Sequence, residues 1–479
     1  MDYSQFFNMI PEATLMLALV IVFLADLIFK GERKHCYTSL LMYIALLAQT
    51  VVCFTASPAE AFSGLYEASA ACNAMKGILT AGTFIVVVMA QSWLVQDEVK
   101  RVSGEFYTLT LSTLLGMYMM MSSGNFLMFF LGLEMASVPM ACMVALNKYR
   151  NESAEGAAKF ILTATFSSGV MLYGISFLYA ATGTLYFGDV MSNLTATPLV
   201  IMGLVFFFSG LGFKISLVPF HFWTADSYQG APTTVTGYLS VISKGAAAFT
   251  LCTVLMKVFG PMVEYWQYML FIVIVLSITV ANLFAIHQSD LKRFMAFSSI
   301  SQAGYIVLAI VGNQATSVYA LSFYVLIYVV ANMAVFTIIS SIEEHNNGVV
   351  DMESYNGLYQ TNPRLAFLMT LALFSLGGIP PFAGMFSKFF VFMAAVKGAD
   401  LATTTGALAY IVVFIALVNT VISLYYYLLI VKAMYIKPNE HPLPTFQSAT
   451  STKLALAVCT TGVLLFGVCS FIYEWIALA

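Results

Sequence analysis

The run PLVIMGLVFFFSGLGFKISLVPFHFW, residues 198–223, is long and apolar enough to cross a membrane, yet it holds a lysine and a proline. About 20 apolar residues in a helix span the roughly 30 Å of hydrocarbon in a bilayer. Lys214 lies deep in this run, where a charge costs about 2.5–3.5 kcal/mol on insertion scales. Pro219 follows it, and a proline inside a helix removes a backbone hydrogen bond. We therefore expect a helix that is broken near the middle of the membrane, beside a buried charge.

The rest of the chain has the same apolar character. Of its 479 residues, 60% are hydrophobic and 9% are charged, whereas soluble domains carry about 25% charged residues. The mean hydropathy is +0.88. The sequence therefore predicts an all-α integral membrane protein with about fourteen transmembrane helices. The predicted helices cover residues 12–30, 38–56, 77–95, 104–122, 125–147, 154–182, 198–226, 232–257, 265–287, 292–312, 316–342, 364–396, 404–436 and 454–476.

The basic residues predict the orientation of these helices, because Lys and Arg concentrate in cytoplasmic connections. If the N-terminus lies outside, fourteen of the 20 basic residues fall in inner connections, and only Lys76, Lys257 and Lys397 fall in outer ones. This bias favours an N-terminus and a C-terminus that both face the outer, periplasmic side.

Three further charges lie inside predicted helices. Lys244 is in the eighth, Lys388 follows Pro380 and Pro381 in the twelfth, and Glu134 is in the fifth. Such charges could be static ion pairs or could snorkel to the interface. However, three lysines with Lys214 included outnumber the one carboxylate, and each is flanked by apolar residues. Because buried lysines exchange protons readily, the pattern favours a proton relay.

The two broken helices are the seventh and the twelfth, so they run in opposite directions through the membrane. This arrangement is typical of inverted repeats, and we expect two repeats of five helices each, without strong identity between them. Asn419 is the nearest polar counterpart of Lys244 in the second repeat. The expected units are residues 1–103 (helices 1–3), 104–258 (first repeat), 259–437 (second repeat) and 438–479 (helix 14).

Other residues give weaker signals. His221, near the first break, could pass protons between lysines or could bind freed carbonyls, and Tyr425, Tyr426 and Tyr427 suggest packing or an interfacial aromatic belt. The seven cysteines form no C-x-x-C pair, and neither a P-loop nor a haem-binding pair of histidines is evident. A net charge of −3 gives no reason to expect nucleic acid. We expect no cofactor or metal in this chain, and energy for proton movement must come from elsewhere.

Residues 212–249, GFKISLVPFHFWTADSYQGAPTTVTGYLSVISKGAAAF, closely resemble a signature of the antiporter-like membrane subunits of respiratory complex I. The run from Trp223 to Thr236 is most similar to the subunit N (ND2-like) family. DLKRFMAFSSISQAGY (290–305) and GGIPPFAGMFSKFFVF (377–392) match further blocks of these subunits. The resemblance covers about the fourth to the thirteenth predicted helix.

The resemblance implies a proton-translocating subunit of NADH:quinone oxidoreductase. The character of the loops and of the N-terminus favours a bacterial inner membrane over an organelle. NADH, FMN, iron–sulfur clusters and quinone would bind in other subunits, and the antiporter-like M subunit and small membrane subunits would be the neighbours. Glu134 would pair with and tune Lys214, Lys244 would connect the two halves, and Lys388 would serve the second half-channel. Gln302 stands where the family often has His, and glutamine can order water but cannot titrate. The alternatives are a subunit of an Mrp-type cation/proton antiporter and a scaffold whose charges are only structural.

Overall fold

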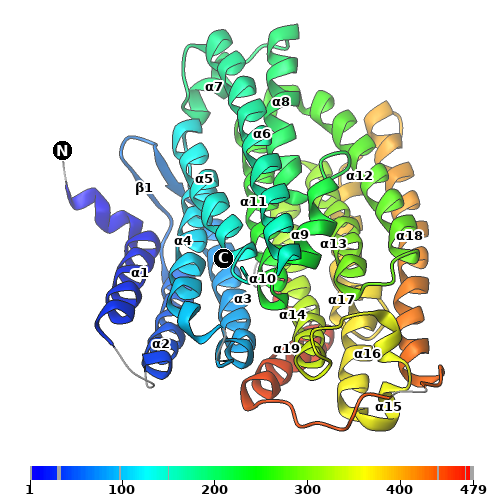
Figure 1. The fold of residues 1–479 in the computed structure, drawn as a ribbon. Coiled ribbons are helices and arrows are strands. Elements are labelled where there is room, and N and C mark those ends of the chain that lie inside the picture. Colours follow the sequence, from blue (N-terminus) through cyan, green and yellow to red (C-terminus); the bar gives the residue numbers. More distant parts are fainter. Residues whose placement is uncertain are drawn as a thin grey trace.

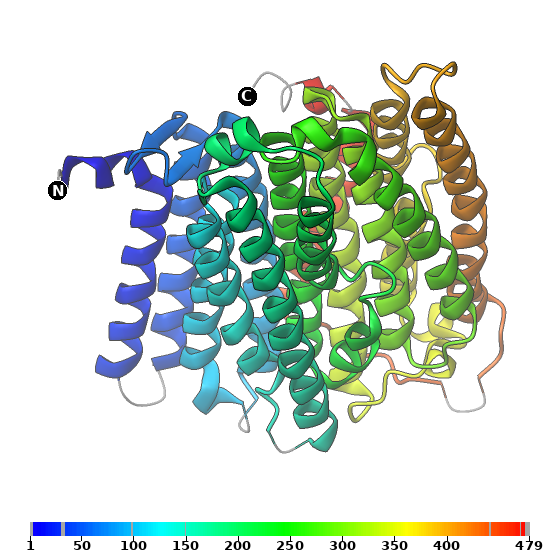
Figure 2. The same cartoon turned by 90° about the horizontal axis from the view of Figure 1, so that it is seen from above.

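The computed structural model describes residues 3–29, 34–96, 99–148, 150–439, 442–469 and 471–474. These residues form a bundle of helices that run side by side (Figure 1; Figure 2). Lys30, Arg33 and the predicted end of the last helix at residues 475–476 lie outside the described residues.

The N-terminal part contains three long helices and a small hairpin that pairs Glu60 with Glu67. Its elements are η1 (Tyr3–Met9), α1 (Ile10–Ile28), α2 (Lys34–Thr55), β1 (Ala59–Ala61), β2 (Tyr66–Ala68), α3 (Ala70–Leu94) and η2 (Lys100–Val102).

The next part contains the first broken helix. Its elements are α4 (Ser103–Met121), α5 (Phe126–Val144), α6 (Asn151–Thr182), α7 (Phe187–Asn193), α8 (Pro198–Ile215), α9 (Phe222–Gly230), α10 (Thr233–Tyr238), the π-helical turn η3 (Leu239–Ser243) and α11 (Lys244–Lys257).

The last part contains the second broken helix. Its elements are η4 (Gly260–Met262), α12 (Val263–Ile286), α13 (Leu291–Leu308), η5 (Ala309–Gly312), α14 (Ala315–His345), η6 (Met352–Tyr355), α15 (Leu358–Thr361), α16 (Pro363–Gly377), α17 (Ala383–Val396), α18 (Thr404–Tyr435) and α19 (Thr450–Val468).

The predicted all-α membrane class is confirmed, since 12 helices of the described part are long and apolar enough to cross a membrane. The structure places helix in all fourteen predicted ranges, but two of these ranges fall short of a simple span by length or hydropathy. α16 and α17 are only 15 and 14 residues long because the chain is interrupted between them. The hydropathy of α4 is lowered by Glu105 and by serine, threonine and glycine residues. The number fourteen and the inverted repeats stay predictions.

Both expected breaks are present. α8 ends at Ile215, Ser216 takes a left-handed conformation with φ of 65°, and α9 begins only at Phe222. α16 ends at Gly377, Gly378 has φ of 83°, and α17 begins at Ala383. Prolines lie in both interruptions, where no helical backbone hydrogen bond has to be made.

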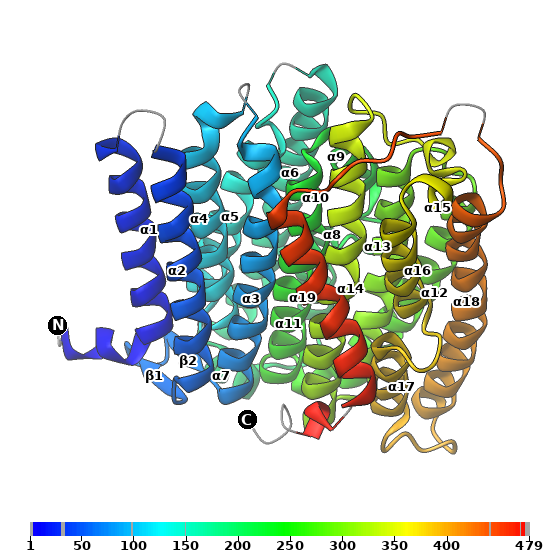
Figure 3. The same ribbon diagram turned by 90° about the horizontal axis from the view of Figure 1, so that it is seen from below.

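The most buried helices are α13 and α14, which run through the middle of the bundle. η1 and the end of α19 lie at the same end of the bundle (Figure 3). The side of the membrane on which the two termini lie stays a prediction. The connection between α18 and α19 crosses the opposite end as an extended segment.

Candidate functional site

Lys214 lies in the last turn of α8, directly before the break. Its side chain is buried, and its Nζ atom lies 5.4 Å from the centre of the Phe160 ring on α6. The Trp223 indole donates a 3.1 Å hydrogen bond to the carbonyl of Phe213, and the amide of Val218 donates to Ser277 Oγ at 2.9 Å. These bonds pair backbone groups at the break, so the lysine is positioned by a defined interruption of the helix.

Glu134 lies in the middle of α5 and is half-buried. Its Oε1 atom is buried and has no hydrogen-bond partner among the described residues. Within those residues, no ion pair closer than 4.0 Å joins Glu134 to Lys214. The expected partnership is therefore not a closed salt bridge in this structure.

Lys244 follows the π-helical turn η3 at the start of α11 and is 1% exposed. Its Nζ atom donates a 2.7 Å hydrogen bond to Ser299 Oγ on α13 and lies 5.2 Å from the centre of the Tyr228 ring. The Tyr228 hydroxyl is itself 3.2 Å from Ser299 Oγ. Such π-helical turns often occur at functional sites, and this one directly precedes the residue that contacts α13.

Lys388 lies on α17, six residues after the second break ends, and is 4% exposed. Its Nζ atom donates to the Gly377 carbonyl at 3.4 Å and lies 4.9 Å from the centre of the Tyr305 ring. The lysine lines a cavity of about 10 Å³ together with Gln302 and Tyr328. A cavity of this size is close to what one water molecule needs.

The polar face of α13 lies between Lys244 and Lys388. Gln302 donates from Nε2 to the Tyr427 hydroxyl at 3.1 Å and accepts at Oε1 from the Tyr324 hydroxyl. The Tyr427 hydroxyl is also 2.6 Å from Ser298 Oγ. Because Ser299 binds Lys244 and Gln302 lines the cavity of Lys388, one helix connects the surroundings of both lysines.

Tyr427 is a component that the sequence reasoning missed. Tyr425 is 55% exposed, as an aromatic residue facing lipid would be, whereas Tyr426 and Tyr427 are fully buried. The signal that could have found the connection is on α13, where polar residues recur at helical spacing (Ser298, Gln302) within an apolar run.

Among the described residues, neither His221 nor Asn419 makes a hydrogen bond with Lys214, Lys244 or Lys388. His221 lies in the first break, stacks on Phe222 with ring centres 4.7 Å apart, and has a buried Nδ1 without a partner among the described residues. Its role in a relay stays a prediction. Asn419 on α18 binds Asn282 of α12 through a 3.0 Å hydrogen bond, so it links two helices where Lys244 would have its counterpart.

The middle of α9 carries a surface charge that is paired with two basic residues. Asp226 accepts hydrogen bonds from Lys159 and from Arg293, both at 2.7 Å. Shortly before α10, the Ala231 carbonyl accepts a 2.8 Å hydrogen bond from the buried Lys292 of α13. Lys292 also lies 3.8 Å from Glu343. These contacts hold α9 against α6 and α13, and they hold the chain before α10 against α13.

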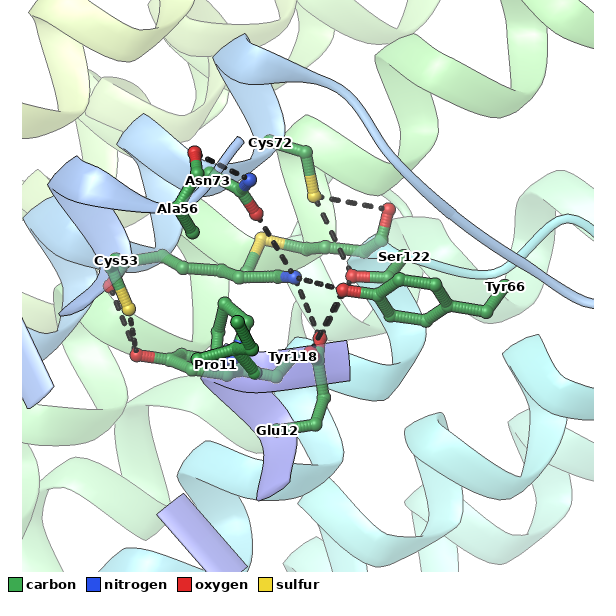
Figure 4. A network of polar contacts seen from close by, with 12 residues as sticks. Pro11, Glu12, Cys53, Ala56, Tyr66, Cys72, Asn73, Tyr118 and Ser122 are labelled. Atoms are coloured by element: carbon green, nitrogen blue, oxygen red, sulfur yellow. Dashed lines mark hydrogen bonds and ion pairs between the residues drawn. The ribbon is translucent and has the colours of Figure 1, made fainter. Parts of the chain in front are cut away.

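The placement of Lys76 in an outer connection is wrong. α3 begins at Ala70, seven residues before the predicted start, and Lys76 is fully buried within it. Lys76 Nζ lies 2.6 Å from Glu12 Oε1, and the Glu12 carboxylate also accepts from Tyr66 at 2.9 Å and from Ser122 at 3.0 Å (Figure 4). A lysine can lie in a buried helix when such a partner compensates its charge, and this partner is 64 residues away in the sequence.

No group of three or more His, Cys, Asp or Glu side chains suited to a metal ion occurs in the described ranges.

Comparisons with known proteins identify the family of the chain. Residues 123–430 match a family described as NADH:quinone oxidoreductase/Mrp antiporter, TM. NADH-quinone oxidoreductase subunit N of Phocaeicola vulgatus is 55% identical over 99% of this chain and 98% of its own length. A chain of respiratory complex I from Thermus thermophilus is 28% identical with a TM-score of 0.81, covering 97% of this chain and 98% of that one.

A chain of the Mrp complex from Dietzia shares the fold, with a TM-score of 0.79 over 99% of this chain and 95% of that one, at 17% identity. The match to subunit N of Phocaeicola vulgatus covers a similar share of the chain at 55% identity and is therefore much stronger. The chain therefore belongs to the NADH:quinone oxidoreductase/Mrp antiporter membrane family and, within it, to the subunit N family.

Proposed function

We propose that this chain is a membrane subunit of NADH:quinone oxidoreductase and that it translocates protons along its buried lysines. The observation that carries the proposal is the polar face of α13, because Ser299 binds Lys244 at 2.7 Å and Gln302 lines the cavity beside Lys388. Two buried ammonium groups on different helices are thereby linked by side chains and by room for water.

In this mechanism Lys214 receives a proton at the first break, Lys244 carries it to the polar face of α13, and Lys388 releases it at the second break. Glu134 changes the proton affinity of Lys214 when charge in a neighbouring subunit moves it closer or farther away. Its buried, unpartnered Oε1 supports this role, since a carboxylate already held in a closed pair could respond less. His221 would serve as an additional proton acceptor in the first break.

The energy required is modest. Moving one proton against 100 mV costs about 2.3 kcal/mol, and a shift of one pKa unit corresponds to 1.36 kcal/mol. A displaced ion pair in a low-dielectric interior can supply a change of that order. The chain needs no redox centre for this step, because quinone reduction elsewhere in the complex would move the charge.

The wider setting belongs to the same proposal. The membrane would be a bacterial inner membrane with both termini outside, and the neighbours would be an antiporter-like M subunit and small membrane subunits. Residues 104–258 and 259–437 would form two inverted repeats, flanked by residues 1–103 and 438–479. An Mrp-type antiporter is the second candidate, because the description of the matching family names Mrp antiporters as well.

The test is proton pumping by the intact complex in proteoliposomes. We expect Lys244→Met and Lys388→Met to lower the number of protons moved per NADH oxidised, with the complex assembled. Lys397→Met, which removes an exposed lysine just beyond α17, is the matched control. Unchanged stoichiometry in both buried-lysine variants would contradict the proposal, and sodium-dependent proton flux without NADH would favour the antiporter.

A further inference from the structure

A cavity of about 700 Å³ lies between the starts of α16 and α19. Leu365, Leu368 and Leu456 line its apolar part, and Arg364 and Lys453 lie at its polar end, in the first turns of the two helices. The volume falls within the range of about 300–1,000 Å³ that is usual for small-molecule sites. This cavity, with these five residues, is named here the α16–α19 groove.

The positive charge of the groove is not compensated. Arg364 and Lys453 are exposed, and in the part of the chain that the structure describes neither has a carboxylate within 4.0 Å. The first turns of α16 and α19 also lack a side-chain cap. Helix N-termini carry partial positive charge, so the two helices add to the attraction that the two cations exert on an anion.

The extended segment before α19 makes a fixed wall for the groove. Thr445 Oγ1 donates to the Thr361 carbonyl at 3.0 Å, and Asn362 donates to the Pro444 carbonyl at 3.1 Å. Asn362 also accepts from the amide of Phe446 at 3.3 Å. The groove therefore exists without a ligand, and a ligand would not have to order this segment when it binds.

The outer surface beside the groove is apolar. Phe367 on α16 is 56% exposed, and Leu454 and Val458 on α19 are 53% and 43% exposed. These side chains continue the apolar wall of the groove onto the surface of the bundle. The groove thus joins a cationic end to an apolar wall at the end of the bundle opposite to the termini (Figure 3).

We propose that the α16–α19 groove binds one anionic phospholipid, with its phosphate between Arg364 and Lys453 and its acyl chains along Leu368 and Leu456. A phospholipid has the charge and the apolar length that the two ends of the groove need, in the same order. Basic pockets between transmembrane helices recognise such headgroups. A helix of a partner protein fits less well, because it would need acidic side chains for the two cations and apolar side chains for the rest of the α16–α19 groove.

The experiment uses the intact complex, reconstituted with a photoactivatable phosphatidylglycerol at low mole fraction, and maps cross-links to peptides of α16 and α19. An otherwise identical phosphatidylcholine tests for the headgroup charge, and inorganic phosphate is added as a competitor. We expect cross-links from phosphatidylglycerol that phosphate does not displace, and few from phosphatidylcholine.

Two variants separate the contributions of charge and cavity. Arg364→Gln with Lys453→Gln should lower the cross-link yield about 30-fold, since each basic residue near anionic headgroups contributes about fivefold. Lys432→Gln with Lys437→Gln removes the same charge at the same end outside the groove and should have little effect. Ala457→Trp keeps both cations but fills the groove, and it should also abolish the cross-links.

Four results would overturn the proposal. Equal labelling by phosphatidylcholine would show that charge does not select the lipid. Displacement by phosphate would show an anion site without bound acyl chains. Full labelling of Ala457→Trp would place the lipid on the surface beside the groove. A partner helix seen in the groove of the assembled complex would show that protein, and not lipid, occupies it.

Discussion

Replacing Lys76 with methionine tests how much of the stability of the N-terminal helices depends on one buried ion pair. Methionine keeps the apolar stem of the lysine and removes the ammonium 2.6 Å from Glu12. The remaining carboxylate is 4% exposed and keeps its hydrogen bonds from Tyr66 and Ser122. Removing one member of a buried pair costs about 3–5 kcal/mol, because the other charge stays buried without compensation. We therefore expect the Lys76→Met variant to lose about 4 kcal/mol of stability.

The assay is the rate at which the detergent-solubilised complex loses activity at a fixed temperature, because large assemblies unfold irreversibly. If half of the lost stability lowers the activation free energy of unfolding, the half-life of activity shortens by about 30-fold. Glu12→Gln combined with Lys76→Met should restore most of it, since no charge remains buried. Lys257→Met breaks an exposed pair with Glu67 of equal length and should cost less than about 1 kcal/mol.

The reasoning would be refuted if Lys76→Met were as stable as the double variant at neutral pH. The carboxylate would then be hydrated, and the pair would contribute nothing specific to the N-terminal helices.

Three further outcomes follow from the site. Ser299→Ala removes the hydrogen bond that Lys244 donates, and hydrogen bonds to charged groups contribute about 1.5–3 kcal/mol. Proton pumping in proteoliposomes should therefore slow at least about 10-fold. NADH oxidation in the presence of an uncoupler should persist. Tyr427→Phe removes a buried hydroxyl and should also slow pumping, whereas Tyr425→Phe, at an exposed position, should not; equal effects would exclude a role for this hydroxyl. Asp226→Asn breaks half-exposed ion pairs and should lower the thermal stability of the complex by about 1 kcal/mol or less per pair, measured as inactivation half-life at low and high salt.

The buried lysines of the proposed relay could be found from the sequence because each interrupts a long apolar run. The breaks could be found because proline cannot donate the hydrogen bond that a helix interior requires. Both signals are local, and they located Lys214 and Lys388 beside the two interruptions.

Lys76 and Tyr427 could not be found in this way. Lys76 lies near a helix end, where a lysine normally reaches water, and its partner Glu12 comes from another helix. Tyr427 is one of three consecutive tyrosines, and only the rotation of α18 decides which of them meets Gln302. The hairpin of β1 and β2 was also missed, because its strands have three residues each and depend on distant bonds such as Glu67 to Ser122.

The π-helical turn η3 makes the spacing of the chain as important as its side chains. The turn holds one more residue than an α-helical turn would between Thr233 and Lys244. Deleting a single residue there would let the segment relax to a regular helix. The missing residue removes about 100° of rotation and the regular winding restores nearly as much, so Lys244 would keep its direction toward Ser299. An added residue has no such compensation and would rotate Lys244 by about 100°. We therefore expect this segment to tolerate the loss of one residue in a mutational scan but not a gain.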